Sequence, residues 1–176
     1  MGNFVRDWEM SPREKALIFV DSCNQYHAAK QAFNGGRLNY RALHNYVTAE
    51  YEVRNAYAYV VRNPADPVQC RFFDAIRYQG FTLQVKDLRT HPDGTQEVNW
   101  DVGIALDAYV FANDNAINHV VLVSGDGDFV PLIKKLQSKG CHIMVMSFSK
   151  VLSRELAAEA NKVILLDDPR FRYLTP

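Results

Sequence analysis

The sequence has little of what marks several common classes of protein. Its 20 basic and 20 acidic residues cancel, so no global field attracts a polyanion. The three cysteines, Cys23, Cys70 and Cys141, lack the paired spacings of a zinc site or a disulfide framework, which favours a reducing compartment. Residues 1–15 contain no long apolar run, so we expect neither a signal peptide nor a membrane anchor. These absences predict a cytoplasmic protein with no membrane partner.

Several catalytic and nucleotide-binding motifs are also missing. No GxGxxG follows the first apolar run and no GxxxxGK[ST] occurs, which argues against dinucleotide and P-loop binding. The GDG at residues 125–127 resembles that of haloacid-dehalogenase-like phosphatases, but these need a second Asp two residues after the nucleophile, and Cys23 stands two residues after Asp21. The five histidines are scattered, without a convincing triad. A protein nucleophile is therefore not indicated.

The pattern of apolar residues predicts one α/β domain. A chain of 176 residues with 48% apolar residues can bury about 70% of its unfolded surface. No repeat or linker divides it. Short apolar runs predict buried strands at 16–20, 56–61, 81–85, 120–123, 143–147 and 163–166. Longer amphipathic stretches predict helices at 24–33, 40–51, 68–79, 102–112, 129–138 and 153–161.

Glycine and proline positions agree with those boundaries. Gly80 and Gly140 follow predicted helices, while Pro67 and Pro131 stand in first turns. Strands that alternate with helices predict a three-layer α/β/α, Rossmann-like domain around a mainly parallel sheet of five or six strands. Ligands of such folds bind at the carboxyl ends of the strands. Residues 89–96 are predicted to form the most mobile loop.

Three aspartates from separate segments are expected to meet at that edge. Asp21 ends the first predicted strand, Asp126 follows the fourth, and Asp101 begins a helix. Carboxylates crowded together repel each other, so the arrangement is favourable chiefly around a hard cation. Mg²⁺ or Mn²⁺ is the natural occupant, and such ions support phosphodiester hydrolysis without a protein nucleophile.

The chain resembles the NYN domains, a branch of the PIN-like nucleases, and among them the LabA-like bacterial proteins. The resemblance covers about residues 16–166 and lies in IFVDSCNQY, WDVGIALDAY and VVLVSGDGDFVPLI. It implies a PIN fold and a ribonuclease with metal-binding and catalytic residues Asp21, Asp101 and Asp126. Asn24 and Asp128 would assist as supporting ligands or by orienting water, and Ser124 would hydrogen-bond a carboxylate.

One position departs from the family pattern. The family commonly has a lysine three residues before the helix aspartate, where this chain has Val98. A phosphate-neutralising cation is then missing unless Lys86 or Arg89 supplies it. Asp107 lies six residues beyond Asp101, about 120° round the helix, so it is assigned only a supporting role.

Each of these residues also has a purely structural interpretation. Asp21 can cap the following helix, and Asp128 can interact with a helix dipole. Trp100 is expected to pack under a loop rather than stack on a base. The segments FFDAIRY and DAYVF have the spacing of core-facing stripes. The lysines of the helix after the motif form a solvated face or track a phosphate backbone: Lys134, Lys135 and Lys139.

The combined expectation is an N-terminal extension (1–14), an NYN domain (15–168) and a C-terminal tail (169–176) that packs on the body or meets a partner. The domain would be an Mg²⁺- or Mn²⁺-dependent endoribonuclease that leaves 5′-phosphate and 3′-hydroxyl ends on single-stranded or structured RNA. The alternative is a noncatalytic module that binds RNA or a protein. A DNA nuclease is a third interpretation, disfavoured because no DNA-gripping insert is visible. A homodimer could assemble the basic surface that one neutral subunit lacks.

Overall fold

The computed structural model describes residues 12–66, 68–90, 92–97, 99–113 and 116–173. Its centre is a six-stranded sheet in the order β4–β3–β1–β7–β8–β9, with every neighbouring pair parallel. The strands are β1 (Lys15–Asp21), β3 (Glu52–Arg62), β4 (Thr82–Asp87), β7 (Ile117–Val123), β8 (His142–Ser147) and β9 (Lys162–Leu165). The predicted parallel α/β sheet is confirmed.

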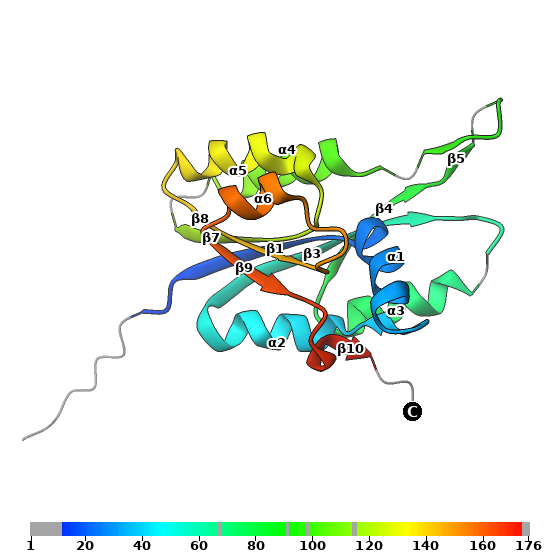
Figure 1. Cartoon of the computed structure of the whole chain (residues 1–176), viewed down its shortest axis with the longest axis horizontal. Helices are drawn as coiled ribbons and strands as arrows, with labels where there is room; N and C mark the ends of the chain where they lie inside the picture. Colours follow the sequence, from blue (N-terminus) through cyan, green and yellow to red (C-terminus); the bar gives the residue numbers. More distant parts are fainter. Residues whose placement is uncertain (1–11, 67, 91, 98, 114–115, 174–176) are drawn as a thin grey trace, which may run out of the picture.

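Helices cover both faces of the sheet (Figure 1). One face carries α1 (Ser22–Ala32), α2 (Tyr40–Glu50) and α3 (Gln69–Tyr78), and the other carries α4 (Asp101–Phe111), α5 (Val130–Gln137) and α6 (Arg154–Glu159). Alternate side chains of a strand point to opposite faces. Ile18 accordingly lies in one core cluster and Phe19 in the other, both fully buried. The sheet is therefore buried on both sides, as its continuous apolar runs predict.

The strand order positions the functional edge. From β1 the chain builds the sheet outward through β3 to β4, and then returns so that β7 pairs with the other side of β1. The order of the strands thus reverses between β1 and β7. In open α/β sheets, the crevice beyond the carboxyl ends at such a switch point is the usual ligand site.

Two segments differ from the sequence-based expectation. The second large strand, β3, begins at Glu52 rather than residue 56, because the polar residues before its apolar run still pair their backbone with β1. The predicted loop 89–96 contains a small antiparallel ribbon, β5 (Arg89–Thr90) and β6 (Gln96–Glu97). The Asp93 carboxylate closes its turn by accepting hydrogen bonds from Thr95. Pro67 lies outside the described residues.

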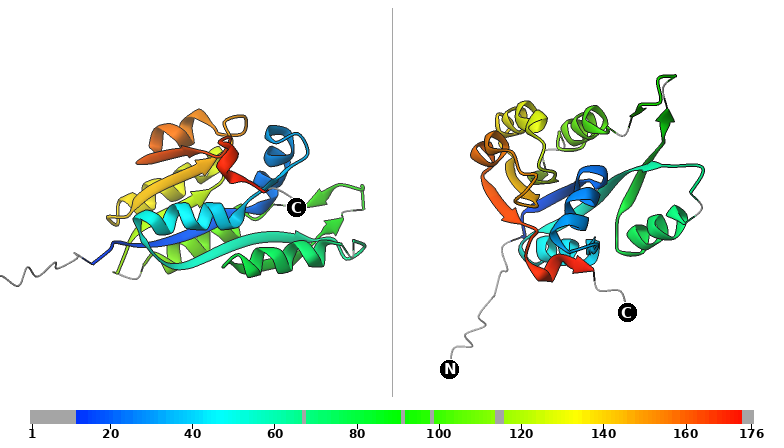
Figure 2. Two further views of the ribbon diagram at one scale, coloured as in Figure 1. Left: turned by 90° about the horizontal axis from the view of Figure 1, so that it is seen from below. Right: turned by 45° about the vertical axis from the view of Figure 1, so that its right-hand side comes forward.

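The C-terminal segment packs on the body of the domain. The 3₁₀ helix η2 (Pro169–Phe171) leads into β10 (Arg172–Tyr173), which pairs antiparallel with β2 (Arg37–Leu38). Phe171 is only 1% exposed and makes an edge contact with Tyr46 of α2. Figure 2 shows this red segment beside the cyan α2. Of the tail expected at 169–176, residues 169–173 are thus part of the fold.

The two aromatic helix segments are core only in part. In FFDAIRY, Phe73 and Ile76 are buried, but Tyr78 is 85% exposed. In DAYVF, Ala108 is buried, whereas Val110 is 61% exposed. A helix presents one face to the core, so a dense aromatic run cannot be wholly buried. Among the described residues, no helix has both the length and the apolar character that a bilayer span requires.

Candidate functional site

The loop after β7 holds Asp126 and Asp128 in a fixed conformation. The Asp126 carboxylate accepts a hydrogen bond from the backbone N–H of Asp128 at 2.9 Å and caps the 3₁₀ helix η1 (Gly127–Phe129). A Cβ at Gly125 would lie 2.3 Å from the carbonyl oxygen of Val151, so only glycine fits there. The glycine of the Ser-Gly-Asp sequence is therefore required by packing.

The first turn of α4 presents Asp101. The Asn99 side-chain oxygen accepts a hydrogen bond from the Asp101 N–H at 2.6 Å, and its amide donates to the Asp101 carboxylate. Trp100 folds back over α4, where a Cβ at Gly103 would lie 2.6 Å from its ring. The Trp100 indole N–H donates to the Val60 carbonyl at 2.9 Å. Trp100 therefore packs against α4 and β3, where it is partly buried against the core and also lines a groove beside the site.

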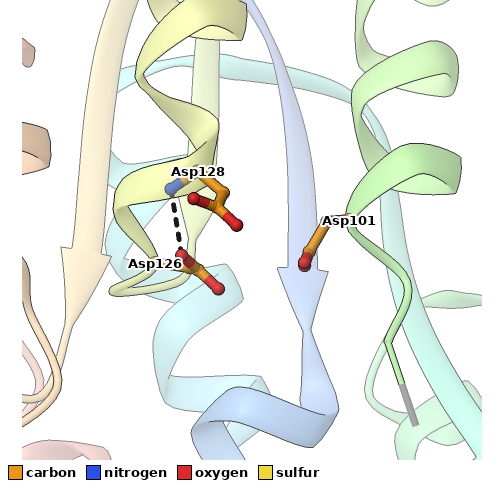
Figure 3. Close-up of side chains that lie close together, drawn as sticks. All are labelled: Asp101, Asp126 and Asp128. Carbon is orange, nitrogen blue, oxygen red and sulfur yellow. Dashed lines mark hydrogen bonds between the residues drawn. The ribbon is translucent and has the colours of Figure 1, made fainter. Parts of the chain in front are cut away.

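Three carboxylates converge at this edge of the sheet. Asp101, Asp126 and Asp128 each offer an oxygen, and these atoms all lie within 4.8 Å of one another. Figure 3 shows Asp101 reaching across from the start of α4 toward the loop that carries the other two. Asp101 and Asp126 were predicted metal ligands, while Asp128 was predicted to assist. The structure places Asp128 in one cluster with Asp101 and Asp126.

Asp21 lies deeper, at the end of β1. It is 5% exposed, and its carboxylate accepts hydrogen bonds from the Asn24 N–H at 3.1 Å and the Ser124 hydroxyl at 3.3 Å. Burial raises the pKa of Asp21 to about 6, with the negative charges of Asp101 and Asp126 adding to the increase. Asp21 therefore caps α1 and also faces the acidic cluster, although it is not one of the three converging carboxylates.

Asn24 and Ser124 join the two strands that carry the site. The Asn24 side-chain oxygen accepts hydrogen bonds from the Gly125 N–H at 3.3 Å and from the Gln25 amide at 2.7 Å. The Ser124 hydroxyl donates to Asp21 and accepts from the Asp126 N–H at 3.3 Å. These contacts tie the end of β1 to the loop after β7, and so set the spacing of the aspartates.

Asp107, predicted as a supporting residue, has a different contact. Its carboxylate accepts a hydrogen bond at 2.8 Å from the hydroxyl of Tyr59, a fully buried residue of β3. Burial and this hydrogen bond both raise the pKa of Tyr59. Asp107 is not part of the three-carboxylate cluster; the turn of the helix separates it from Asp101, as the 120° offset indicated.

Lys86 supplies a positive charge beside the cluster. Its ammonium donates to the Asn99 carbonyl and lies 5.2 Å from the centre of the Trp100 ring. Its charge also opposes the increase that burial and neighbouring carboxylates cause in the pKa of Asp101. Val98 lies outside the described residues. The sequence pattern did not single out Asn99, although an asparagine two residues before a helix aspartate is a recognisable capping signal.

The one cysteine near the site is not activated. Cys23 follows Asp21 by two residues, and burial together with the negative charge of Asp21 raises the pKa of its thiol to about 11. The reactive form of cysteine is the thiolate, which is scarce at neutral pH under these conditions. The chemistry available here is that of clustered oxygen ligands, which suit Mg²⁺ and Mn²⁺.

The acidic cluster opens into a groove of about 710 Å³. Asp21, Asp101 and Asp126 line part of it, and residues of α1, α3, β2, β3 and β10 are among those that line the rest. Clefts of about 300–1,000 Å³ are the usual size for ligand sites. The site therefore consists of clustered carboxylates at one part of a groove large enough to hold a ligand.

A family model for the NYN domain matches residues 15–167. The chain belongs to the NYN domain family. It is 34% identical over 165 residues to the low amplitude and bright protein LabA of Synechococcus elongatus, covering 89% of this chain and 86% of that protein. A crystal structure of a protein of unknown function from Vibrio parahaemolyticus superimposes with a TM-score of 0.83 at 33% identity, covering 93% of this chain and 98% of that one.

Family membership confirms the resemblance that the three motifs indicated. Each of those motifs now has a structural place: the end of β1, the start of α4 and the loop after β7. NYN domains are nuclease-like, so the coarse class of this protein is a nuclease-type or RNA-related module.

Proposed function

We propose that this protein is an Mg²⁺- or Mn²⁺-dependent ribonuclease that hydrolyses RNA and leaves 5′-phosphate and 3′-hydroxyl ends. The observation that carries the proposal is the convergence of Asp101, Asp126 and Asp128 beside the buried Asp21. Like charges held this closely are unfavourable without a cation. A scaffold has no physical need for them at one edge of its sheet.

The donor set fits a hard divalent cation. All four groups are carboxylates, and Asp101, Asp126 and Asp128 can each turn an oxygen toward one point. One or two such ions, when bound, would activate a water and stabilise charge on the phosphoryl oxygens. Asp21, at the back of the cluster, would complete the negative charge that holds the ions.

The surrounding residues would keep that geometry rigid. Asn24 and Ser124 fix the distance between β1 and the β7 loop through their hydrogen bonds. Asn99 orients the Asp101 carboxylate, and Lys86 brings a positive charge to the same side of the cluster. Lys86 is the residue we assign to the role of the family lysine, because it neutralises charge next to Asp101.

The test is cleavage of end-labelled single-stranded, hairpin and transfer RNA in Mg²⁺ and in Mn²⁺, with EDTA as the metal-free control. Asp126→Asn and Asp101→Asn should abolish cleavage. Asp74→Asn is the matched control, because Asp74 is exposed and pairs only with Arg77 in the described contacts. Metal-independent cleavage, or products with 2′,3′-cyclic phosphate ends, would contradict the mechanism.

A second candidate function is a noncatalytic module that binds RNA in regulation. The replacement of the family's lysine by Val98, three residues before Asp101, favours it, because a catalytic site needs a cation to neutralise the phosphate more than a binding module does. RNA binding without cleavage in either metal would support this alternative. Direct titration of Mn²⁺ by calorimetry would then decide whether the carboxylate cluster still binds an ion.

A further inference from the structure

The groove beside the acidic cluster has a second part with a different composition. Asp21 caps the N-terminus of α1, and Tyr26, in the second turn of that helix, also lines the groove. Tyr26 is 37% exposed. Its ring lies 6.4 Å from that of Phe72 on α3, with the two planes tilted. Two aromatic rings from different helices therefore meet in the groove that the carboxylates also line.

Positive charges accompany these rings. The Arg37 guanidinium lies 5.8 Å from the centre of the Phe72 ring, and the Lys30 ammonium lies 4.5 Å from that of Tyr26. Arg37 and Arg71 both line the groove. In a chain with no net charge, this is a local concentration of cations beside an aromatic surface.

The C-terminal segment completes this part of the groove. Tyr173 of β10 pairs with Arg37 of β2, and both line the groove. The segment is fixed in place because the buried Phe171 anchors it and the Asn39 N–H donates to the Phe171 carbonyl at 2.7 Å. The NYN family model matches residues 15–167, so Tyr173 lies just beyond the matched region.

We infer that this aromatic groove, formed by Tyr26, Arg37, Arg71, Phe72 and Tyr173, binds unpaired nucleotides of single-stranded RNA that flank the phosphate at the acidic cluster. The inference rests on the proposed function, because it takes the acidic cluster as the place where the RNA backbone is cut. The exposed aromatic rings contact bases, and the two arginines contact phosphates.

Three features favour an unpaired strand over a duplex. Bases are free to stack on aromatic side chains only when they are unpaired. The charges are few and local, whereas tight duplex binding needs many phosphate contacts. The groove is continuous with the carboxylates, so a strand lying in it places a phosphate at the acidic cluster. His27, which follows Tyr26 and contacts it edge-on at 5.4 Å, extends the same surface.

The experiment measures binding in EDTA, where no cleavage occurs. A fluorescein-labelled 10-nucleotide single-stranded RNA is titrated with the full-length protein and followed by fluorescence anisotropy. Tyr26→Ala and Tyr173→Ala should each weaken binding by about tenfold or more, as loss of a base-stacking ring does. Tyr26→Phe should retain near wild-type affinity. Tyr78→Ala is the matched control, since Tyr78 is a highly exposed tyrosine outside the groove.

The arginines have a separate signature. Arg37→Ala should weaken binding and reduce the slope of log affinity against log salt by about 0.7, the value for one phosphate contact on a single strand. Arg54→Ala is its control, because Arg54 is exposed, pairs with Glu52 and does not line the groove. An unlabelled duplex of the same sequence should compete at least about tenfold less well than the single strand.

The outcomes separate this inference from the proposed function. Loss of binding in Tyr26→Ala but not in Tyr78→Ala supports the groove, whether or not the same RNA is later cut in Mg²⁺ or Mn²⁺. Equal affinity of all tyrosine variants, or equal competition by duplex, overturns the groove even if wild-type protein cleaves RNA. If the wild-type protein does not cleave RNA in either Mg²⁺ or Mn²⁺ but its binding still depends on Tyr26 and Tyr173, the proposed ribonuclease activity is rejected and the groove is retained.

Discussion

Replacing Asp21 with asparagine is expected to stabilise the metal-free protein while it removes a charge from the proposed metal site. The pKa of Asp21 rises from an ordinary 3.8 to about 6, chiefly because the carboxyl is buried. One pKa unit corresponds to about 1.4 kcal/mol, so ionisation of this group at pH 7 costs the folded state about 3 kcal/mol. The asparagine oxygen can still accept the hydrogen bond from the Asn24 N–H.

The effect depends on pH in a defined direction. The folded protein keeps the Asp21 proton to higher pH than the unfolded chain does, so the free energy of unfolding of the wild type falls as pH rises from about 4 to about 6. The Asp21→Asn variant has no carboxyl group at this position, so its free energy of unfolding should not show this decrease. The two proteins should therefore be similar in stability near pH 4 and should differ by up to about 3 kcal/mol at pH 7.

Thermal and urea unfolding in EDTA, followed by circular dichroism, measure this difference. For a chain of this size, about 3 kcal/mol corresponds to a rise of roughly 6–12 °C in Tm. Asp74→Asn, at an exposed position, should change Tm by little at either pH. An Asp21→Asn variant that is no more stable than wild type at pH 7, or equally stabilised at pH 4, would refute the assignment of a buried, destabilising charge.

Three further predictions follow from packing and burial. Gly125→Ala should lower the free energy of unfolding in urea by about 2 kcal/mol or more, since the added Cβ would overlap the Val151 carbonyl. An unchanged urea midpoint would show that the loop after β7 can move to accept the methyl group. Phe171→Ala should lower the free energy of unfolding by about 3–5 kcal/mol, because the ring is fully buried against α2. A decrease below about 1 kcal/mol would mean that the C-terminal segment is not part of the core. The Cys23 thiol, with its pKa raised to about 11 by burial, should react with a thiol reagent at pH 7.5 far more slowly than the exposed Cys70; equal rates in a mass-spectrometric time course would contradict this.

Much of the fold could be predicted from local pattern. Continuous apolar runs identify strands buried on both faces, and Gly80 and Gly140, both with positive φ, mark helix ends as their sequence positions indicated. The weaker predictions fell where local signals conflict with tertiary contacts. The start of β3 is polar, and its strand character comes from pairing with β1. In DAYVF, the apolar pattern could not show that Val110 stays 61% exposed.

The candidate site divides in the same way. The sequence by itself determined that Asp21, Asp101 and Asp126 stand at the ends of their elements, because strand and helix boundaries are local properties. The strand order, which places β1 beside β7, was decided only by the tertiary structure. That order brings Asp128 into the cluster and leaves Asp107 with Tyr59.

The groove was beyond the reach of sequence because its parts are far apart in the chain. Tyr26, Phe72 and Tyr173 belong to α1, α3 and β10, and no spacing rule connects residues that meet through packing of separate elements. A sequence records which side chains are available and the local structure that each adopts. Only the folded chain decides which of them share a surface, because long-range contacts depend on how the layers pack around the sheet.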